Sequence, residues 1–221
     1  LTALEHSLDG DFSRCIDILF HSSGRTAVTG IGKSGHVARK IAATLNSTGT
    51  PAYFIHPSEA SHGDLGCVAA NDVLLALSNS GESLELGDIL SYAARRSIPV
   101  IAMTKNPGSF LGRQSACVLQ LPDVGEAGPL GCAPTSSTTM MMALGDALAL
   151  TLMRRRGCSP EEFHRWHPGG SLGRKLLTVR EIMHTGEDMP LLAASARMPD
   201  VLMQMTGKGF GVAGILSGNR L

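Results

Sequence analysis

The chain has 221 residues, a formal net charge of zero and 17% charged residues. This length suffices for one α/β domain with a sizeable core and part of another module, and the balanced charge argues against a basic nucleic-acid-binding surface. No apolar run reaches the roughly 20 residues that cross a bilayer, and charged residues interrupt the first twenty positions, so we expect neither a membrane span nor a signal peptide. The five cysteines are scattered without a C-x-x-C pair, which indicates reduced thiols in a soluble, cytoplasmic protein.

Short apolar runs alternate along the chain with segments of helical periodicity. The expected strands are 26–29, 52–55, 73–78, 99–103 and 117–121, and the expected helices are 1–20, 36–46, 84–96, 110–115 and 137–156. This alternation predicts the α/β class with a doubly wound parallel sheet. In such sheets ligands bind outside the carboxyl ends of the strands.

Two serine- and glycine-rich loops follow expected strands and precede expected helices. They are Gly30-Ile31-Gly32-Lys33-Ser34-Gly35-His36 and Ser78-Asn79-Ser80-Gly81-Glu82-Ser83. Free backbone N–H groups, hydroxyls and the positive end of a helix make such a loop an anion cradle. Two of them, with a third hydroxyl-rich helix start at 135–139, predict a site for a phosphorylated small molecule.

Nucleotide-binding motifs fit these loops less well. The spacing Gly30-x-Gly32-x-x-Gly35 matches the dinucleotide fingerprint, but the next strand ends without the acidic residue that holds the ribose. A P-loop ending in Lys33-Ser34 requires glycine at position 27, where this chain has Ala27.

The character of the sequence changes after Arg156, and from Thr178 the chain reads as a second module. A short helix at 180–183, a helix near 198–206 and a strand at 211–216 predict a second module that extends over 178–221 and is incomplete.

Seven segments together resemble the arabinose-5-phosphate isomerase family, which is built on the sugar isomerase (SIS) domain. They are 32–36, 47–51, 56–57, 61–66, 78–82, 129–139 and 167–174. The resemblance covers residues 1–177, and the segment from Thr178 is similar to the opening of the CBS-domain pair that follows in this family. It implies reversible interconversion of D-ribulose 5-phosphate and D-arabinose 5-phosphate through an enediol(ate), a step that supplies 3-deoxy-manno-octulosonate for lipopolysaccharide.

The resemblance also implies roles for individual residues. The expected catalytic residues are Lys33, Glu85, Glu126 and His167, and the expected substrate-binding residues are Ser34, Gly49, Thr50, His56, His62, Ser78, Ser80 and Ser83. Of the two acids in the second loop, Glu82 directly follows the cradle glycine and suits the positive end of the helix, whereas Glu85 matches a functional position of the family and is preferred. Glu126 is expected to show the larger turnover loss on substitution. His167 is expected to reach a neighbouring subunit's site in a homotetramer, and His164 is assigned no role.

Enediol chemistry requires no cofactor, but the spacing of His56, Glu59 and His62 suits a borderline metal, so a zinc contact at His56 is retained. Two other functions stay open. One is an SIS isomerase of another ketose phosphate. The other is a sugar-phosphate-sensing regulator without turnover, which requires only the cradle.

Overall fold

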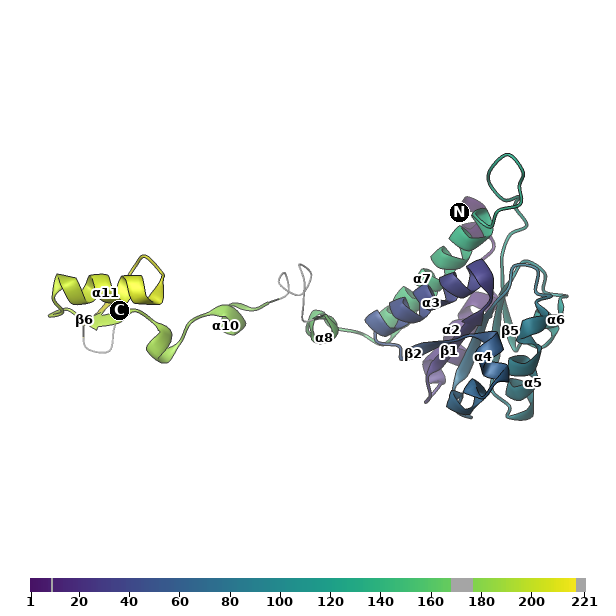
Figure 1. The fold of residues 1–221 in the computed structure, drawn as a ribbon, viewed down its shortest axis with the longest axis horizontal. Coiled ribbons are helices and arrows are strands. Elements are labelled where there is room, and N and C mark those ends of the chain that lie inside the picture. Colours follow the sequence, from purple (N-terminus) through teal and green to yellow (C-terminus); the bar gives the residue numbers. More distant parts are fainter. Residues whose placement is uncertain (9, 168–176, 218–221) are drawn as a thin grey trace. The chain divides into compact units, whose positions relative to one another are not determined.

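The structure is a computed structural model that describes residues 1–8, 10–167 and 177–217 (Figure 1). The chain divides into two units, residues 1–168 and residues 169–221, which are described separately. The boundary expected between 177 and 178 borders the segment 168–176, which lies outside the described residues, so that boundary stays a prediction.

The first unit is built on a five-stranded parallel sheet. Its strands are β1 (Thr26–Gly30), β2 (Ala52–Ile55), β3 (Val73–Leu77), β4 (Val100–Thr104) and β5 (Cys117–Gln120), and their order in the sheet is β2-β1-β3-β4-β5. All four neighbouring pairs are parallel. The expected fold class is confirmed, with each strand within one or two residues of its predicted range.

Helices cover both faces of this sheet, which explains why the strands read as continuous apolar runs. One face carries α2 (Gly10–His21), α3 (Gly32–Ser47) and α7 (Ser136–Arg155), and the other carries α4 (Pro57–Ser61), α5 (Gly87–Arg95) and α6 (Phe110–Arg113) (Figure 1). Within β3, Leu75 and Leu77 pack into the first layer, whereas Leu74 and Ala76 pack into the second. The core therefore lies in two layers on either side of the sheet.

Helices α3 and α7 lie side by side and run in the same direction (Figure 1). Lys40 on α3 pairs with Asp146 near the middle of α7, and Gly145 lies so close to Ile41 that a Cβ would meet that side chain at 2.4 Å. At the far end, Arg156 Nη1 donates to the Gly49 carbonyl just beyond α3. Since α3 begins at the carboxyl end of β1, both helices present their N-termini at that edge of the sheet.

Two sequence expectations are wrong in detail. The single helix expected over 1–20 is two helices, α1 (Thr2–His6) and α2. Helix α1 ends because the Ser7 hydroxyl and N–H both donate to the Leu4 carbonyl. The helix expected over 84–96 begins with a 3₁₀ turn, Leu84–Leu86, before α5. Helix α4, a 3₁₀ turn at Asp64–Cys67 and the full extent of α8 (Pro160–Trp166) were not predicted.

The second unit contains α10 (Val179–Ile182), a 3₁₀ turn (Gly186–Asp188), β6 (Leu191–Ala193), α11 (Met198–Lys208) and β7 (Gly214–Leu216). Strands β6 and β7 pair in parallel, and α11 connects them. The sequence predicted the helices and β7 but missed β6. In the parts of the chain that the structure describes, no helix has both the length and the apolar character needed to span a membrane.

All five cysteines are free, as the scattered spacing predicted. Cys15 of α2 and Cys117 of β5 meet in the core with their Sγ atoms 2.7 Å apart, and burial raises the pKa of both thiols. The sequence spacing of 102 residues gave no sign of this contact.

Candidate active site

The two cradle loops start from neighbouring strands. Gly30, the last residue of β1, is the register partner of Leu77, the last residue of β3. The strand order also reverses at this point, because β1 has β2 on one side and β3 on the other. In open parallel sheets such a switch point forms a crevice where ligands bind. The fold therefore brings the two loops together, as their sequence positions predicted.

The first loop leaves its polar groups available. Gly32 has φ +57°, a left-handed conformation, and a Cβ on the buried Gly35 would lie 2.7 Å from the Gly30 carbonyl oxygen. These glycines let the backbone turn directly from β1 into α3. The N-cap residue of α3 makes no side-chain capping bond, and among the described residues neither Lys33 nor Ser34 has a hydrogen-bonding or ionic partner. The N–H groups at the start of α3, the Ser34 hydroxyl and the Lys33 ammonium therefore all belong to this loop.

The second loop is ordered by its own serines. The buried Ser78 Oγ accepts from the Gly81 N–H at 3.0 Å and lies 2.9 Å from Ser83 Oγ, while Ser80 Oγ accepts from the Glu82 N–H at 3.2 Å. Gly81 has φ +74°, and a Cβ there would lie 1.9 Å from Ser109 Oγ. Three of the expected substrate-binding hydroxyls are thus gathered in one turn.

The two acids of this loop differ in what they contact. Glu82 Oε1 accepts, at 3.1 Å, from the N–H of Phe110, which is the first residue of α6. Glu85 is exposed in the 3₁₀ turn after Ser83 and has no partner among the described residues. Glu82 holds the start of α6, whereas Glu85 has no partner in the described part of the chain, and the preference for Glu85 stays a prediction.

Glu126 lies in the loop after β5, at the same edge as the cradle. Its Oε2 accepts from the backbone N–H groups of Thr135 (2.8 Å) and Ser137 (3.2 Å) and from the Thr135 hydroxyl (3.3 Å), at the N-terminus of α7. Partial burial by itself would raise the pKa of the carboxyl, but the bonds from the Ser137 hydroxyl and from these donors outweigh it and lower the pKa to about 2. The hydroxyl-rich start of α7, the third such position in the sequence, therefore binds the chain's own Glu126 carboxylate.

His56 and His62 flank α4, which follows β2 at the cradle edge. His56 Nδ1 accepts from the Ser58 N–H at 3.3 Å and caps that helix, so the proton of the neutral ring is on Nε2. Neither nitrogen then offers a lone pair to a metal, and no cluster of three metal-ligating side chains occurs among the residues that the structure describes. His56 in this arrangement does not offer a ligand atom to zinc, whereas its Nε2–H can donate to a substrate oxygen.

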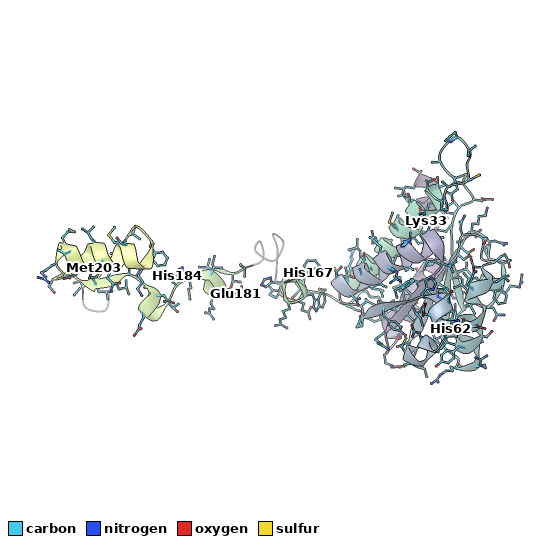
Figure 2. All side chains as sticks on the ribbon, in the orientation of Figure 1. Lys33, His62, His167, Glu181, His184 and Met203 are labelled. Atoms are coloured by element: carbon cyan, nitrogen blue, oxygen red, sulfur yellow. The ribbon has the colours of Figure 1, made fainter. Side chains whose placement is uncertain are left out.

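The remaining expected residues lie elsewhere. Gly49 and Thr50 directly precede β2, at the amino edge of the sheet. The Trp166 ring rests on Gly49, where a Cβ would meet it at 2.2 Å, and His167 follows at the end of α8. Thr50 is 3% exposed and its hydroxyl has no hydrogen-bond partner among the described residues. Figure 2 shows His167 apart from Lys33 and His62. Sequence reasoning did not single out Trp166, although it directly precedes the segment 167–174.

Comparisons with known proteins agree with this geometry. The family model of the SIS domain matches residues 19–151. The arabinose 5-phosphate isomerase KdsD of Yersinia pestis is 46% identical over 213 residues, which cover 96% of this chain and 65% of the relative. The KdsD of Pseudomonas aeruginosa is 48% identical over 207 residues, which cover 93% of this chain and 64% of the relative. The chain thus spans about two thirds of the length of these relatives.

Among solved structures, the c3406 protein of Escherichia coli CFT073, in complex with arabinose 5-phosphate, superimposes with a TM-score of 0.72 at 38% identity. The match covers 76% of this chain and 90% of that protein. The chain therefore belongs to the SIS-domain family, in the branch whose relatives are named arabinose 5-phosphate isomerase.

Proposed function

We propose that this protein catalyses the reversible interconversion of D-ribulose 5-phosphate and D-arabinose 5-phosphate in the cytoplasm, without a required cofactor. The observation that carries the proposal is the junction of the two serine- and glycine-rich loops at the β1/β3 switch point. Lys33 and Glu85 lie in or next to these loops and have no partner within the described residues. The relatives named arabinose 5-phosphate isomerase support the choice of sugar. A sensor of sugar phosphates would require the cradle alone.

The phosphate is proposed to bind between the loops. The N-terminal N–H groups of α3 and the hydroxyls of Ser34, Ser80 and Ser83 would donate to its oxygens, and the Lys33 ammonium would balance its charge. Ser78 supports this turn from beneath, because its own hydroxyl is buried and accepts from Gly81. A phosphate held in this way would fix the carbon chain at the carboxyl edge of the sheet.

Isomerisation moves a proton between C1 and C2 while another proton moves between the two oxygens. We propose Glu85 as the group that takes and returns the carbon-bound proton, since it is exposed and has no partner among the residues that the structure describes. Glu126 remains a proposed catalytic residue, but a carboxylate with a pKa of about 2 is a weak base near neutral pH. Its fixed charge suits orientation of the loop and of substrate hydroxyls. The Nε2–H of His56 would donate to a substrate oxygen.

The site is proposed to be shared between subunits of a homotetramer. A five-residue strand at ~3.3 Å per residue separates the cradle from Gly49 and Thr50 by roughly 16 Å, longer than the reacting part of the substrate. His167 lies beyond α8 at the far edge, so it would act on the cradle of another chain. Residues 178–221 are proposed to open a CBS pair, which the parallel β6–α11–β7 arrangement supports.

We expect Glu85→Gln to lower turnover by about 10²- to 10⁴-fold, because the amide keeps the shape but cannot transfer the proton. The assay incubates each variant with a panel of ketose phosphates and scores the aldose products. Glu82→Gln is the matched control, since its amide oxygen still accepts from the Phe110 N–H and turnover should change little. Binding of sugar phosphates without turnover by the unsubstituted protein would make it a sensor.

We expect Ser80→Ala to raise the Michaelis constant roughly tenfold or more, because a hydrogen bond to a charged group contributes about 1.5–3 kcal/mol. Steady-state kinetics would measure this, and circular dichroism would verify the fold. Ser115→Ala, between α6 and β5, removes a hydroxyl bonded only to the Leu111 carbonyl and serves as the control. An unchanged Michaelis constant in Ser80→Ala would place the phosphate elsewhere.

We expect the stabilising effect of Glu126 to depend on pH. Its carboxyl pKa falls from 4.5 to about 2 on folding, so its contribution is complete above pH 4.5 and is lost as the pH falls towards 2. Urea unfolding of the unsubstituted protein and Glu126→Gln should therefore differ most near pH 6 and progressively less between pH 4.5 and 3. Glu59→Gln, an exposed charge on α4, is the control. A difference independent of pH would contradict the capping role.

We expect His167→Ala and Glu85→Gln proteins, each nearly inactive, to recover part of the activity when they are mixed and reassembled. Mixed oligomers would contain some sites with both unsubstituted residues, supplied by different chains. Subunit exchange would be verified by mass spectrometry of differently labelled chains. Subunit exchange without recovery of activity would mean that His167 acts in its own chain's site or takes no part in the reaction. A protein that is monomeric in solution would exclude the shared site.

A further inference from the structure

The His167 side chain is held on two sides by one residue of α8. Its Nδ1 lies 2.9 Å from the Phe163 carbonyl oxygen, and its ring stacks on the Phe163 ring with centroids 4.2 Å apart and an interplanar angle of 24°. Phe163 and His167 are four residues apart, so the end of the helix brings both contacts together. A solvated histidine would have neither restraint.

The hydrogen bond determines which ring nitrogen carries the proton. A carbonyl oxygen only accepts, so His167 Nδ1 must donate, and in the neutral ring Nε2 is then left with the lone pair. We propose that Phe163 is a positioning residue that holds His167 in the Nδ1–H tautomer and presents its Nε2 as a proton acceptor. The catalytic part of this inference rests on the proposed function, in which His167 takes part.

The helix that carries both residues is itself firmly anchored. Ser159 and Glu162 form a reciprocal capping box at its start, with bonds of 3.2 and 3.0 Å, and Pro160 occupies the first turn. At its end the Trp166 ring rests on Gly49. The turn that bears Phe163 is therefore fixed at both ends, and the stacked ring limits rotation of the imidazole.

His56 provides an internal comparison, because its environment fixes the opposite tautomer. His56 Nδ1 accepts from the Ser58 N–H, so its Nε2 carries the proton and donates. An aldose–ketose isomerisation needs groups of both kinds, one that donates to a developing oxyanion and one that accepts a proton. The sequence does not indicate which tautomer each histidine adopts, whereas the hydrogen-bond partner of each Nδ1 does.

The test is nitrogen-15 NMR of histidine-labelled, assembled protein, with the His167 signal assigned by its loss in His167→Gln. We expect the unsubstituted protein to show His167 with Nδ1 protonated and Nε2 unprotonated. Phe163→Leu keeps the backbone carbonyl but removes the stacked ring, so the imidazole can rotate away from that carbonyl. The signal should then shift towards a mixture of tautomers, and kcat should fall roughly two- to tenfold with little change in KM, the range that loss of an aromatic pair predicts. Phe163→Tyr, which keeps an aromatic ring, should have the His167 NMR signal and the kcat of the unsubstituted protein. Arg165→Ala, an exposed change on the same helix, should alter neither.

Two results would overturn the inference: an Nε2–H tautomer in the unsubstituted protein, or a Phe163→Leu protein with unchanged NMR signal and unchanged kcat. A third result separates the inference from the proposed function. If the tautomer shifts in Phe163→Leu while His167→Gln retains full turnover, the positioning by Phe163 stands and His167 has no part in the reaction.

Discussion

Parallel pairing of β1 with β3 is the constraint on which the candidate site depends. Gly30 and Leu77 are register partners, so the loops that follow them leave the sheet about one strand spacing apart, roughly 4.8 Å. Each loop alone is an ordinary strand-to-helix turn with a few free N–H groups. Because the crossover through β2 returns the chain to the other side of β1, the two turns leave the sheet from adjacent strands at its carboxyl edge. A different strand order would retain both motifs and lose the site.

The distribution of charge at this edge explains where an anion can bind. Three elements present positive N-terminal ends or hydroxyls there, but the carboxylate of Glu126 already occupies the start of α7. Its pKa of about 2 keeps it ionised throughout the neutral range, so it repels a second anion from that helix. Under the proposed function, a phosphate would thereby be directed to the start of α3 and the turn at Ser78, where Lys33 is the only lysine or arginine that the sequence places in either loop.

Local sequence patterns predicted those features that depend on local physics. The apolar runs of 26–29 and 73–78 indicated the strands, and the glycines and serines after them indicated the cradle, because burial and turn geometry depend on neighbouring residues. The Glu126 cap, the contact of Trp166 with Gly49 and the opposite tautomers of His56 and His167 could not be predicted in this way. Each depends on a partner that only the folded backbone selects, which short-range patterns do not encode.

The division of the expected residues between two edges of the sheet has a consequence for how activity and assembly are linked. A single chain holds the phosphate cradle and Glu85 at one edge, and Thr50 with His167 at the other. In the proposed shared site, an isolated chain would keep the proposed phosphate-binding groups but would have no second chain to bring Thr50 and His167 to its cradle. Assembly would then bring the far-edge residues of one chain to the proposed phosphate cradle of another. The fraction of complete sites would depend on the subunit concentration by mass action.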